Sequence, residues 1–511
     1  MGYASNPSSA TGQGTGTLHA PVGGWNTRDA LAAMKQEYAI KMDNWFPDQG
    51  KITIRKGFAS HATGIGSGAV ESLLEYNGLS ANKMFACGNS AIYDATSAGA
   101  VGAASVSALT NNRWQYVNIG TAGGQFLFCC NGADTARTFD GTSWANSTLT
   151  GPTLANLIWC NTHQTRLFVG EINKLSFWYG GANAITGAFS EFSLAGVAKR
   201  GGFIMAMGTW TRDGGAGPDD VAVFLTSEGE AILYSGTNPG DASVWSLVGV
   251  FRVGNPIGRR CLFKAGSDLI LICEDGFLPM SAVLPIDRAQ SQTVAISDVI
   301  QPTVSESVRS YGTVYGWQGL VYPKGKMLIF NVPLAANTTA HQYTFNSITG
   351  AACRFTGVNA NCWGILNNNA YFGGIDGTVY KFDTGTSDNS ADIQTDLQQA
   401  FSYFGKKSTN KLFKLIRPIF ESTGSFSPVI MFNVDFGTNP TTTTPTVSSG
   451  GPLWDTAVWD TDVWGGEIIL KQWISVSGTG FCASARMRVD TNEHTISLLA
   501  TDFVYQQGIA L

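Results

Sequence analysis

One pattern recurs along most of this chain: an apolar strand, a tight turn and a second strand that often ends in an aromatic residue. Seven such hairpins are recognisable between residues 65 and 385. Three of their turns are Asn-Gly or Asp-Gly pairs, the strongest short-range hairpin signal in a sequence. The seven turns are centred near residues 90, 132, 172, 229, 276, 325 and 377.

The spacing of these turns favours a β-propeller. Successive turns lie 40 to 57 residues apart, with a mean of about 48. Propeller blades are four-stranded sheets, and each blade takes roughly 40 to 50 residues. Residues 65–390 are therefore predicted to form a propeller of about seven blades. The alternative is a set of unrelated hairpins in stacked sandwiches.

The composition supports an all-β chain. Glycine accounts for 61 of the 511 residues, and each glycine inside a helix costs about 1 kcal/mol. Aromatic residues make up 11% and charged residues only 14%, which excludes a disordered chain. Such a low charge content also indicates that other subunits cover part of the surface.

The two ends differ from the repeating region. Residues 1–64 are predicted to form an N-terminal arm, a helix over 27–42, a turn over 44–50 and a short strand over 51–55. Residues 391–511 are predicted to form a β-sandwich-like domain, because apolar and polar residues alternate in two stretches. A protruding loop rich in Thr and Pro separates the two stretches, followed by Trp454, Trp459 and Trp464.

Charge and cysteine usage exclude several function classes. The net charge of −5 provides no general basic field for gripping nucleic acid. The nine cysteines are irregularly spaced, which favours free buried thiols and a reducing compartment. We expect no metal and no cofactor, since the five histidines are scattered and the acidic run Asp455, Asp460 and Asp462 lacks calcium-loop spacing. We also expect no signal peptide and no membrane span.

Motifs that carry catalysis are not evident, so the chain is predicted not to be an enzyme. The segment Phe139–Trp144 is similar to the Asp-box turn of sialidases, but it lacks the leading Ser-x-Asp and is interpreted as a structural turn. A glycosidase would need two carboxylates facing each other in a cleft. With 37 acidic residues, the sequence leaves such a pair open.

Residues 20–58 carry a resemblance to a known protein family. The segment Asn26–Leu31 is followed by a spaced set of residues, namely Asn44, Pro47, Gly50, Arg55 and Gly57. This pattern resembles the opening of tail nozzle proteins of short-tailed bacteriophages, also called packaged-DNA stabilisation or tail tubular proteins. Segments 225–249, 258–260 and 454–464 are similar to phage structural proteins of this length.

The resemblance implies a structural virion subunit. Members of that family form a hexameric ring below the portal and adaptor, retain packaged DNA and conduct it during ejection. The implied partners are copies of the chain, the adaptor and portal, a tail needle or fibre protein, and double-stranded DNA passing through the lumen without sequence recognition. The implied location is the virion tail, after folding in the host cytoplasm. No catalytic residues carry over, and the five opening residues are expected to be structural.

Two basic stretches and the tryptophan run are candidate contacts with neighbouring subunits or the adaptor. They contribute Arg28, Lys406, Lys407, Lys411, Lys414, Trp454, Trp459 and Trp464. Two other functions stay open at this stage. A receptor-binding propeller would expose aromatic and acidic residues to host glycans, and a propeller glycosidase would place a carboxylate pair in its central pocket.

Overall fold

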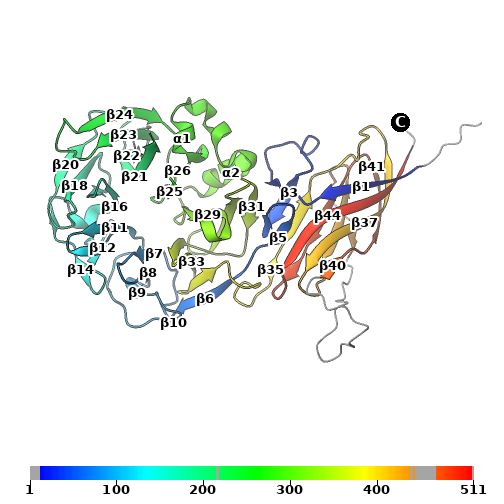
Figure 1. The fold of residues 1–511 in the computed structure, drawn as a ribbon, viewed down its shortest axis with the longest axis horizontal. Coiled ribbons are helices and arrows are strands. Elements are labelled where there is room, and N and C mark those ends of the chain that lie inside the picture. The colour runs from blue at the N-terminus through cyan, green and yellow to red at the C-terminus, as the bar shows by residue number, and fades with distance from the viewer. Residues whose placement is uncertain (1–11, 214–217, 438–440, 444–467, 509–511) are drawn as a thin grey trace, which may run out of the picture. The chain divides into compact units, whose positions relative to one another are not determined.

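The chain divides into two compact units. The computed structural model describes residues 12–213, 218–437, 441–443 and 468–508. Unit 1 comprises Met1–Gly57, Phe345–Phe355 and Gly385–Leu511, and unit 2 comprises Phe58–Thr344 and Thr356–Thr384. Each unit is almost entirely β-structure (Figure 1).

Unit 2 is a β-propeller whose described strands form seven blades, and each blade contains one of the seven predicted hairpins. Blades 1 to 3 are β7–β9 (Ser72–Tyr76, Lys83–Gly88, Ala91–Asp94), β11–β14 (Gln115–Thr121, Gly124–Cys130, Arg137–Phe139, Trp144–Asn146) and β16–β18 with β20 (Leu157–His163, Arg166–Glu171, Ser176–Ala182, Ser190–Ser193). Blades 4 and 5 are β21–β24 (Ile204–Asp213, Pro218–Thr226, Glu230–Gly236, Trp245–Arg252) and β25–β27 (Leu262–Ala265, Asp268–Cys273, Gly276–Pro279). Blades 6 and 7 are β28–β30 (Gln318–Tyr322, Met327–Ala335, Thr339–Asn346) and β32–β34 with β6 (Cys362–Leu366, Asn369–Gly373, Val379–Phe382, Phe58–Thr63). Short parallel pairs add β10 (Gly99–Ala100) beside β6, and β15 (Leu149–Thr150) beside β19 (Gly187–Ala188).

The seven blades close into a ring. The inner strands β7, β11, β16, β21, β25, β28 and β32 each contact the next, and β32 contacts β7 (Figure 1). Blade 7 is completed by β6, the first strand of unit 2, which pairs antiparallel with β34 near its end. The Phe58 ring lies 5.1 Å from that of Phe372 and 5.2 Å from that of Tyr380, between centroids. The two ends of unit 2 are therefore joined within one sheet.

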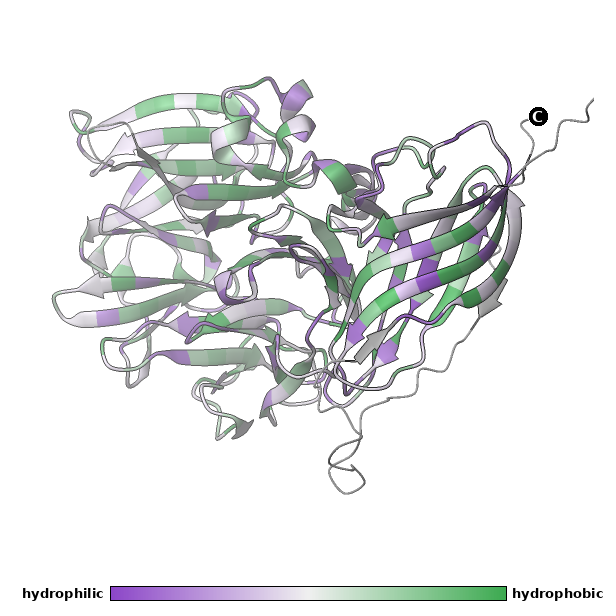
Figure 2. Cartoon of the chain, turned by 45° about the vertical axis from the view of Figure 1, so that its right-hand side comes forward, coloured by the Kyte–Doolittle hydropathy of each residue, from purple (hydrophilic) through white to green (hydrophobic). Residues whose placement is uncertain are grey.

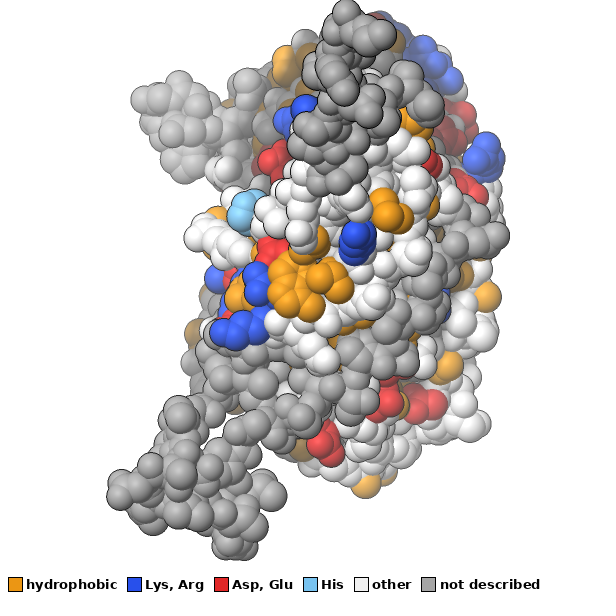
Figure 3. All heavy atoms as spheres, turned by 90° about the vertical axis from the view of Figure 1, so that its right-hand side faces the viewer, with side chains coloured by type: hydrophobic (Ala, Val, Ile, Leu, Met, Phe, Trp, Pro, Cys, Tyr) orange, Lys and Arg blue, Asp and Glu red, His pale blue; other side chains and the backbone are white. Residues whose placement is uncertain are grey.

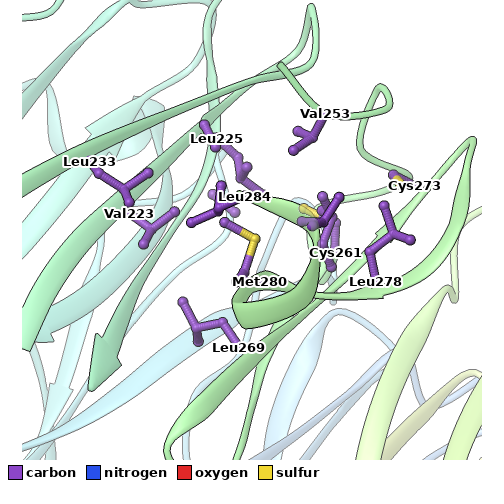
Figure 4. Close-up of a cluster of buried hydrophobic side chains, with 14 of the residues drawn as sticks. Val223, Leu225, Leu233, Val253, Cys261, Leu269, Cys273, Leu278, Met280 and Leu284 are labelled. Carbon is purple, nitrogen blue, oxygen red and sulfur yellow. The ribbon is translucent and has the colours of Figure 1, made fainter. Parts of the chain in front are cut away.

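Apolar side chains fill the space between adjacent blades. Between blades 4 and 5, Val223, Leu225 and Leu233 pack against a second group that includes Leu269 and Met280 (Figure 4). Leu225 is fully buried. Because a propeller blade is covered on both faces, its strands are near-continuous apolar runs, which explains why the hairpins stand out in the sequence.

Helices are few among the described residues. They are α1 (Met280–Val283), α2 (Gln301–Tyr311) and the 3-10 turns η1 to η4 (Leu154–Asn156, Arg288–Val294, Asp298–Ile300, Pro323–Gly325). The α2 helix, which the sequence pattern did not predict, has a proline in its first turn, a position that favours helix initiation. Within the described ranges, none of these helices has the length and apolarity needed to cross a membrane.

Unit 1 is a β-sandwich. One sheet contains β1 (Gln13–His19), β4 (Trp45–Pro47), β5 (Ile52–Ile54), β37 (Lys411–Ser422), β40 (Ile468–Leu470), β41 (Ile474–Gly480) and β44 (Ile496–Gln507). The other contains β2 (Gly24–Trp25), β3 (Tyr38–Asp43), β31 (Ala352–Phe355), β36 (Asp396–Gln399), β38 (Val429–Val434), β39 (Thr441–Thr443) and β42 (Ala483–Arg488). A separate short pair joins β35 (Ile393–Gln394) to β43 (Asp490–Thr491).

The two sheets of the sandwich share an aromatic core. Phe432 of β38 lies 5.4 Å from Phe413 of β37 and 6.4 Å from Phe503 of β44, between ring centroids. All three side chains are buried. Hydrophobic and hydrophilic residues alternate along strands of this unit (Figure 2). The sandwich predicted at the C-terminal end is present, but β38 is buried continuously from Ile430 to Asn433 instead of being half-buried as the alternation indicated.

The domain boundaries predicted from the sequence need correction. Residues 1–64 do not form a separate part: strands from 13 to 54 pair within unit 1, and β6 belongs to the propeller. The physical reason is long-range strand pairing: β6 pairs with β34 from the other end of the propeller, whereas β1 and β5 pair with β44. Sequence order therefore does not follow the division into units.

The helix predicted over residues 27–42 is wrong. These residues form turns and then β3. The Asn26 side chain caps a turn, because its Oδ1 accepts hydrogen bonds from the backbone N–H groups of Arg28 and Asp29. Of the apolar face expected for the helix, Met34 is buried but Leu31 is exposed. Pairing of β3 with β36 overrides the local helix preference.

We expect Leu225→Ala to lower the free energy of unfolding by about 2–5 kcal/mol, because it leaves a cavity between blades 4 and 5. Urea denaturation followed by tryptophan fluorescence measures this change. The control is Leu247→Ala on β24, whose side chain is 43% exposed and should change stability by only about 0.5 kcal/mol. Equal losses in the two variants would contradict the packing described here.

Candidate functional site

A cavity of about 180 Å³ lies where six of the seven inner strands of unit 2 converge. Its walls come from β7, β11, β16, β21, β25 and β28. Polar lining residues include Gln115, Asn161 and Gln318. Two arginines from the segment between β24 and β25, Arg259 and Arg260, also line it. We call this space the axial cavity.

Arg260 is held rigidly at the cavity wall. Its Nη2 donates to Ser72 Oγ at 2.7 Å and to the carbonyl oxygens of Glu71 and Trp114. Its Nη1 donates to Gln318 Oε1 at 3.1 Å. The guanidinium carbon also lies 5.3 Å from the centre of the Tyr315 ring, a cation–π distance. All four of these acceptors are neutral groups.

Arg259 is held more loosely. Its Nη1 donates to the carbonyl oxygen of Asn131 at 3.1 Å. Among the described residues, neither Arg259 nor Arg260 forms an ion pair with a carboxylate. The Glu71 carboxylate is instead engaged by Arg113, whose Nε lies 3.0 Å from Glu71 Oε1.

A buried carboxyl group lies between the inner strands of blades 1, 2 and 7. Glu75 Oε1 accepts a hydrogen bond from the backbone N–H of Ile365, and the Tyr116 hydroxyl also hydrogen-bonds to the carboxyl group. Removal from water raises the pKa of Glu75 to about 7, although these two hydrogen bonds act in the opposite direction. Burial also raises the pKa of Tyr116.

The residues of the opening motif converge in unit 1. Arg55 has a fully buried side chain, and its Nη1 and Nη2 donate to Asp388 Oδ1 and Oδ2 at 2.8 and 2.6 Å. Its Nε donates to Asn44 Oδ1 at 2.8 Å. Asn44 has a left-handed backbone with φ 61° and donates from Nδ2 to the carbonyl oxygen of Gln394. We call Asn44, Arg55 and Asp388 the clasp.

The other three opening residues are also explained by the fold. A Cβ on Gly57 would lie 1.8 Å from the carbonyl oxygen of Ser387, so only glycine fits there. Gly50 has φ 81° in the turn between β4 and β5, where an L side chain would be strained. The Pro47 carbonyl accepts from Asn346 Nδ2 at 2.8 Å.

The basic candidate contacts separate into two groups. Arg28, Lys406, Lys407 and Lys414 are exposed. Lys411 is not: it is fully buried, and its Nζ donates to the carbonyl oxygens of Lys406, Thr409 and Phe481. Burial lowers the pKa of Lys411. Its prediction as a partner contact was wrong, because it faces the interior at the start of β37.

Three further sequence predictions concern the tryptophan run, the cysteines and the turn at Asp140. Trp454, Trp459, Trp464 and the acidic run among them lie outside the described residues, as does most of the Thr/Pro loop. All nine cysteines are buried free thiols, as predicted. Asp140 closes its own turn by accepting from the N–H groups of Thr142 and Ser143, which lowers the pKa of Asp140.

The axial arginines, Glu75 and Asp388 were missed as site residues in the sequence. The signals for the arginines are a pair of adjacent cations in a chain with few charges and the resemblance of segment 258–260 to phage structural proteins. Asp388 had no signal, because it lies 333 residues from Arg55.

Comparisons with known proteins give no family. No family model and no curated protein matches the chain. Solved structures include BBS1N in complex with ARL6DN, 9% identical with a TM-score of 0.41, covering 66% of this chain and 99% of that chain. A putative 6-phosphogluconolactonase from Bacteroides fragilis is 14% identical, with a TM-score of 0.34 and coverages of 64% and 89%. An exo-β-1,3-galactanase from Phanerochaete chrysosporium is 10% identical, with a TM-score of 0.29 and coverages of 76% and 95%. Likenesses this remote carry no functional argument.

We expect Asp388→Ala to lower the free energy of unfolding by about 3–5 kcal/mol, because it leaves the Arg55 guanidinium buried without its carboxylate. Chemical denaturation measures the loss. The matched control is Glu421→Ala, which breaks a half-exposed pair with Lys51 and should cost no more than about 1 kcal/mol. Similar losses of unfolding free energy in the two variants would contradict a larger stabilising role for the clasp than for a half-exposed ion pair.

We expect Glu75 to make stability depend on pH. Its pKa is raised from 4.5 to about 7 on folding, so the folded state holds a proton that the unfolded state has lost between these values. The stabilisation of the folded state by the Glu75 proton is therefore complete below pH 4.5. It is lost as the pH rises to about 7, and the free energy of unfolding falls by about 3 kcal/mol in all. Urea titrations at several pH values measure this loss. Glu75→Gln, which mimics the protonated carboxyl, should flatten this slope, and parallel curves for both proteins would contradict the assignment.

Proposed function

We propose that this chain is a structural, non-catalytic subunit of a bacteriophage tail nozzle, in which a ring of copies extends the DNA channel, retains packaged DNA and conducts it during ejection. The observation that carries the proposal is the clasp. Asn44 and Arg55, which belong to the resemblance with tail nozzle proteins, contact each other, and Gly57 packs tightly against Ser387 beside Asp388. Asn44 and Arg55 flank the hairpin of β4 and β5, so these two matched residues serve one local structure.

The outer strand of blade 4 is a suitable contact surface for a neighbouring copy. Val244, Leu247 and Val248 are each more than 40% exposed, at or beside the start of β24. In the described part of the chain, β24 pairs only with β23, so its other edge is open. Open apolar edges are sites of association. A ring of identical subunits uses heterologous contacts of this kind.

The surface composition agrees with this proposal. On the face shown in Figure 3, most of the described surface is uncharged, although several Lys and Arg side chains gather beside an apolar patch. Charged residues make up only 14% of the whole chain. A weakly charged surface does not hold a polyanion strongly, so DNA could slide along it. In this proposal the ring of copies, rather than the propeller of one copy, provides the channel.

The decisive experiment is the mass of the purified protein, alone and with the portal–adaptor complex of the phage that encodes it. We expect six copies to bind each adaptor ring. Leu247→Glu should abolish ring formation without changing the unfolding midpoint, because it places a charge on the β24 edge. Ser190→Glu, on the outer strand β20 of blade 3, is the matched control and should still assemble. A stable monomer that ignores the adaptor would refute the nozzle.

Binding of host glycans is a second candidate, favoured by a different pocket. A pocket of about 500 Å³ on blade 2 and the adjoining segment 183–186 is lined by Phe126, Asp140, Asn146 and Asn183 among others. This volume lies in the range of roughly 300–1,000 Å³ typical of ligand sites. Binding on a glycan array that Asn146→Ala abolishes would favour this function. The axial cavity is smaller, and none of its described lining residues is Asp or Glu, so it does not supply a glycosidase's carboxylate pair.

A further inference from the structure

We propose that the axial cavity of unit 2 binds a small oxyanion, with Arg259 and Arg260 as its cationic ligands. The inference does not depend on the nozzle proposal, because it concerns the interior of a single propeller. No sequence motif assigns a ligand to this site, although segment 258–260, which holds both arginines, is part of the resemblance to phage structural proteins.

The charge balance of the cavity is the first argument. Two guanidinium groups line it, and the described lining residues include no carboxylate. An arginine keeps its charge at any physiological pH, so the two groups cannot become neutral. Both arginine residues are half-buried, and a bound anion would supply the counter-charge that the described lining residues do not.

The carboxyl groups beside the cavity already have partners. Glu75 hydrogen-bonds to Tyr116, which lines the cavity, and to the backbone N–H of Ile365. The Glu71 carboxylate is bound by Arg113 at 3.0 Å, and Asn112 and Asn337 donate to it as well. Arg260 meets only the backbone carbonyl of Glu71, not its side chain. Arg288 of unit 2 differs from this pair, because Asp275 holds it at 2.8 Å. Arg166, like this pair, donates to carbonyl oxygens.

The side chains that line the cavity offer hydrogen-bond donors to the oxygen atoms of a ligand. Arg259 uses one N–H group on the Asn131 carbonyl, which leaves most of its five donors available to a ligand. Gln115 adds a buried Nε2 that has no hydrogen-bond partner among the described residues. Arg260 is fixed by Ser72, Gln318 and the Tyr315 ring, so its position does not have to be ordered on binding.

The size of the cavity restricts the ligand. At about 180 Å³, the cavity is smaller than the roughly 300–1,000 Å³ of typical ligand sites. Its size therefore favours a small ligand such as a phosphate, a sulfate or a short carboxylate over an oligosaccharide. The planar arginine fork suits both phosphate and carboxylate oxygens, so the shared chemistry is that of a small oxyanion.

Isothermal titration calorimetry of the full chain tests this proposal, with inorganic phosphate in one arm and succinate in the other, at constant ionic strength in chloride buffer. We expect saturable one-site binding in at least one arm, and the arm that responds identifies the source of the oxyanion. Arg259→Gln should weaken binding at least about tenfold, because it removes a charge-assisted hydrogen bond. Arg252→Gln, on an exposed arginine at the end of β24, is the matched control and should bind as the unchanged protein does.

A second variant keeps the test decisive if Arg259→Gln does not fold. Gln115→Ala removes the unpartnered donor without altering charge, and we expect it to weaken binding several-fold. Thermal unfolding of each variant without ligand checks that it is folded. The proposal is overturned if neither anion binds the unchanged protein, or if Arg252→Gln loses as much affinity as Arg259→Gln.

Discussion

Closure of the propeller ring is the constraint on which the rest of the structure depends. The last blade is incomplete until β6, the first strand of unit 2, pairs with β34. This brings the entry and exit of the propeller together, so Gly57 donates its N–H to the Gly385 carbonyl at 3.2 Å. The clasp of Arg55 and Asp388 lies at the same place. The opening motif is therefore the point at which unit 1 secures the two chain segments that lead into and out of the ring.

The scarcity of charges makes the placement of each one informative. In unit 1, Asp396 accepts hydrogen bonds from Lys41, Arg486 and Arg488. Desolvation acts to raise the pKa of Asp396, but hydrogen bonds from Arg486 and Lys41 outweigh it and lower the pKa to about 2. The axial cavity differs from this network, because neither of the two arginines that line it has a carboxylate partner among the described residues. That contrast, rather than any motif, is what singles out the cavity as a binding site.

The sequence predictions succeed where a structure depends on residues close together in the chain. They fail where it depends on residues far apart in the chain. A hairpin depends on neighbouring residues and a tight turn, and all seven predicted hairpins are present. The helix over 27–42 fails because β3 within it pairs with β36, more than 350 residues away. Lys411 looks like a surface cation in sequence, yet carbonyl oxygens from its own loop and from Phe481 enclose its ammonium. Long-range partners of this kind leave no local pattern.

The sequence by itself determined the all-β class, the number of blades and the sandwich at the C-terminal end, because strand periodicity and turn chemistry are local properties. Only the tertiary structure decided that the N-terminal strands join that sandwich, that Arg55 meets Asp388, and that Arg259 and Arg260 line one cavity without a carboxylate partner among the described residues. Ring closure and ion pairing link residues hundreds of positions apart. Their energies depend on burial and geometry, which exist only once the chain has folded.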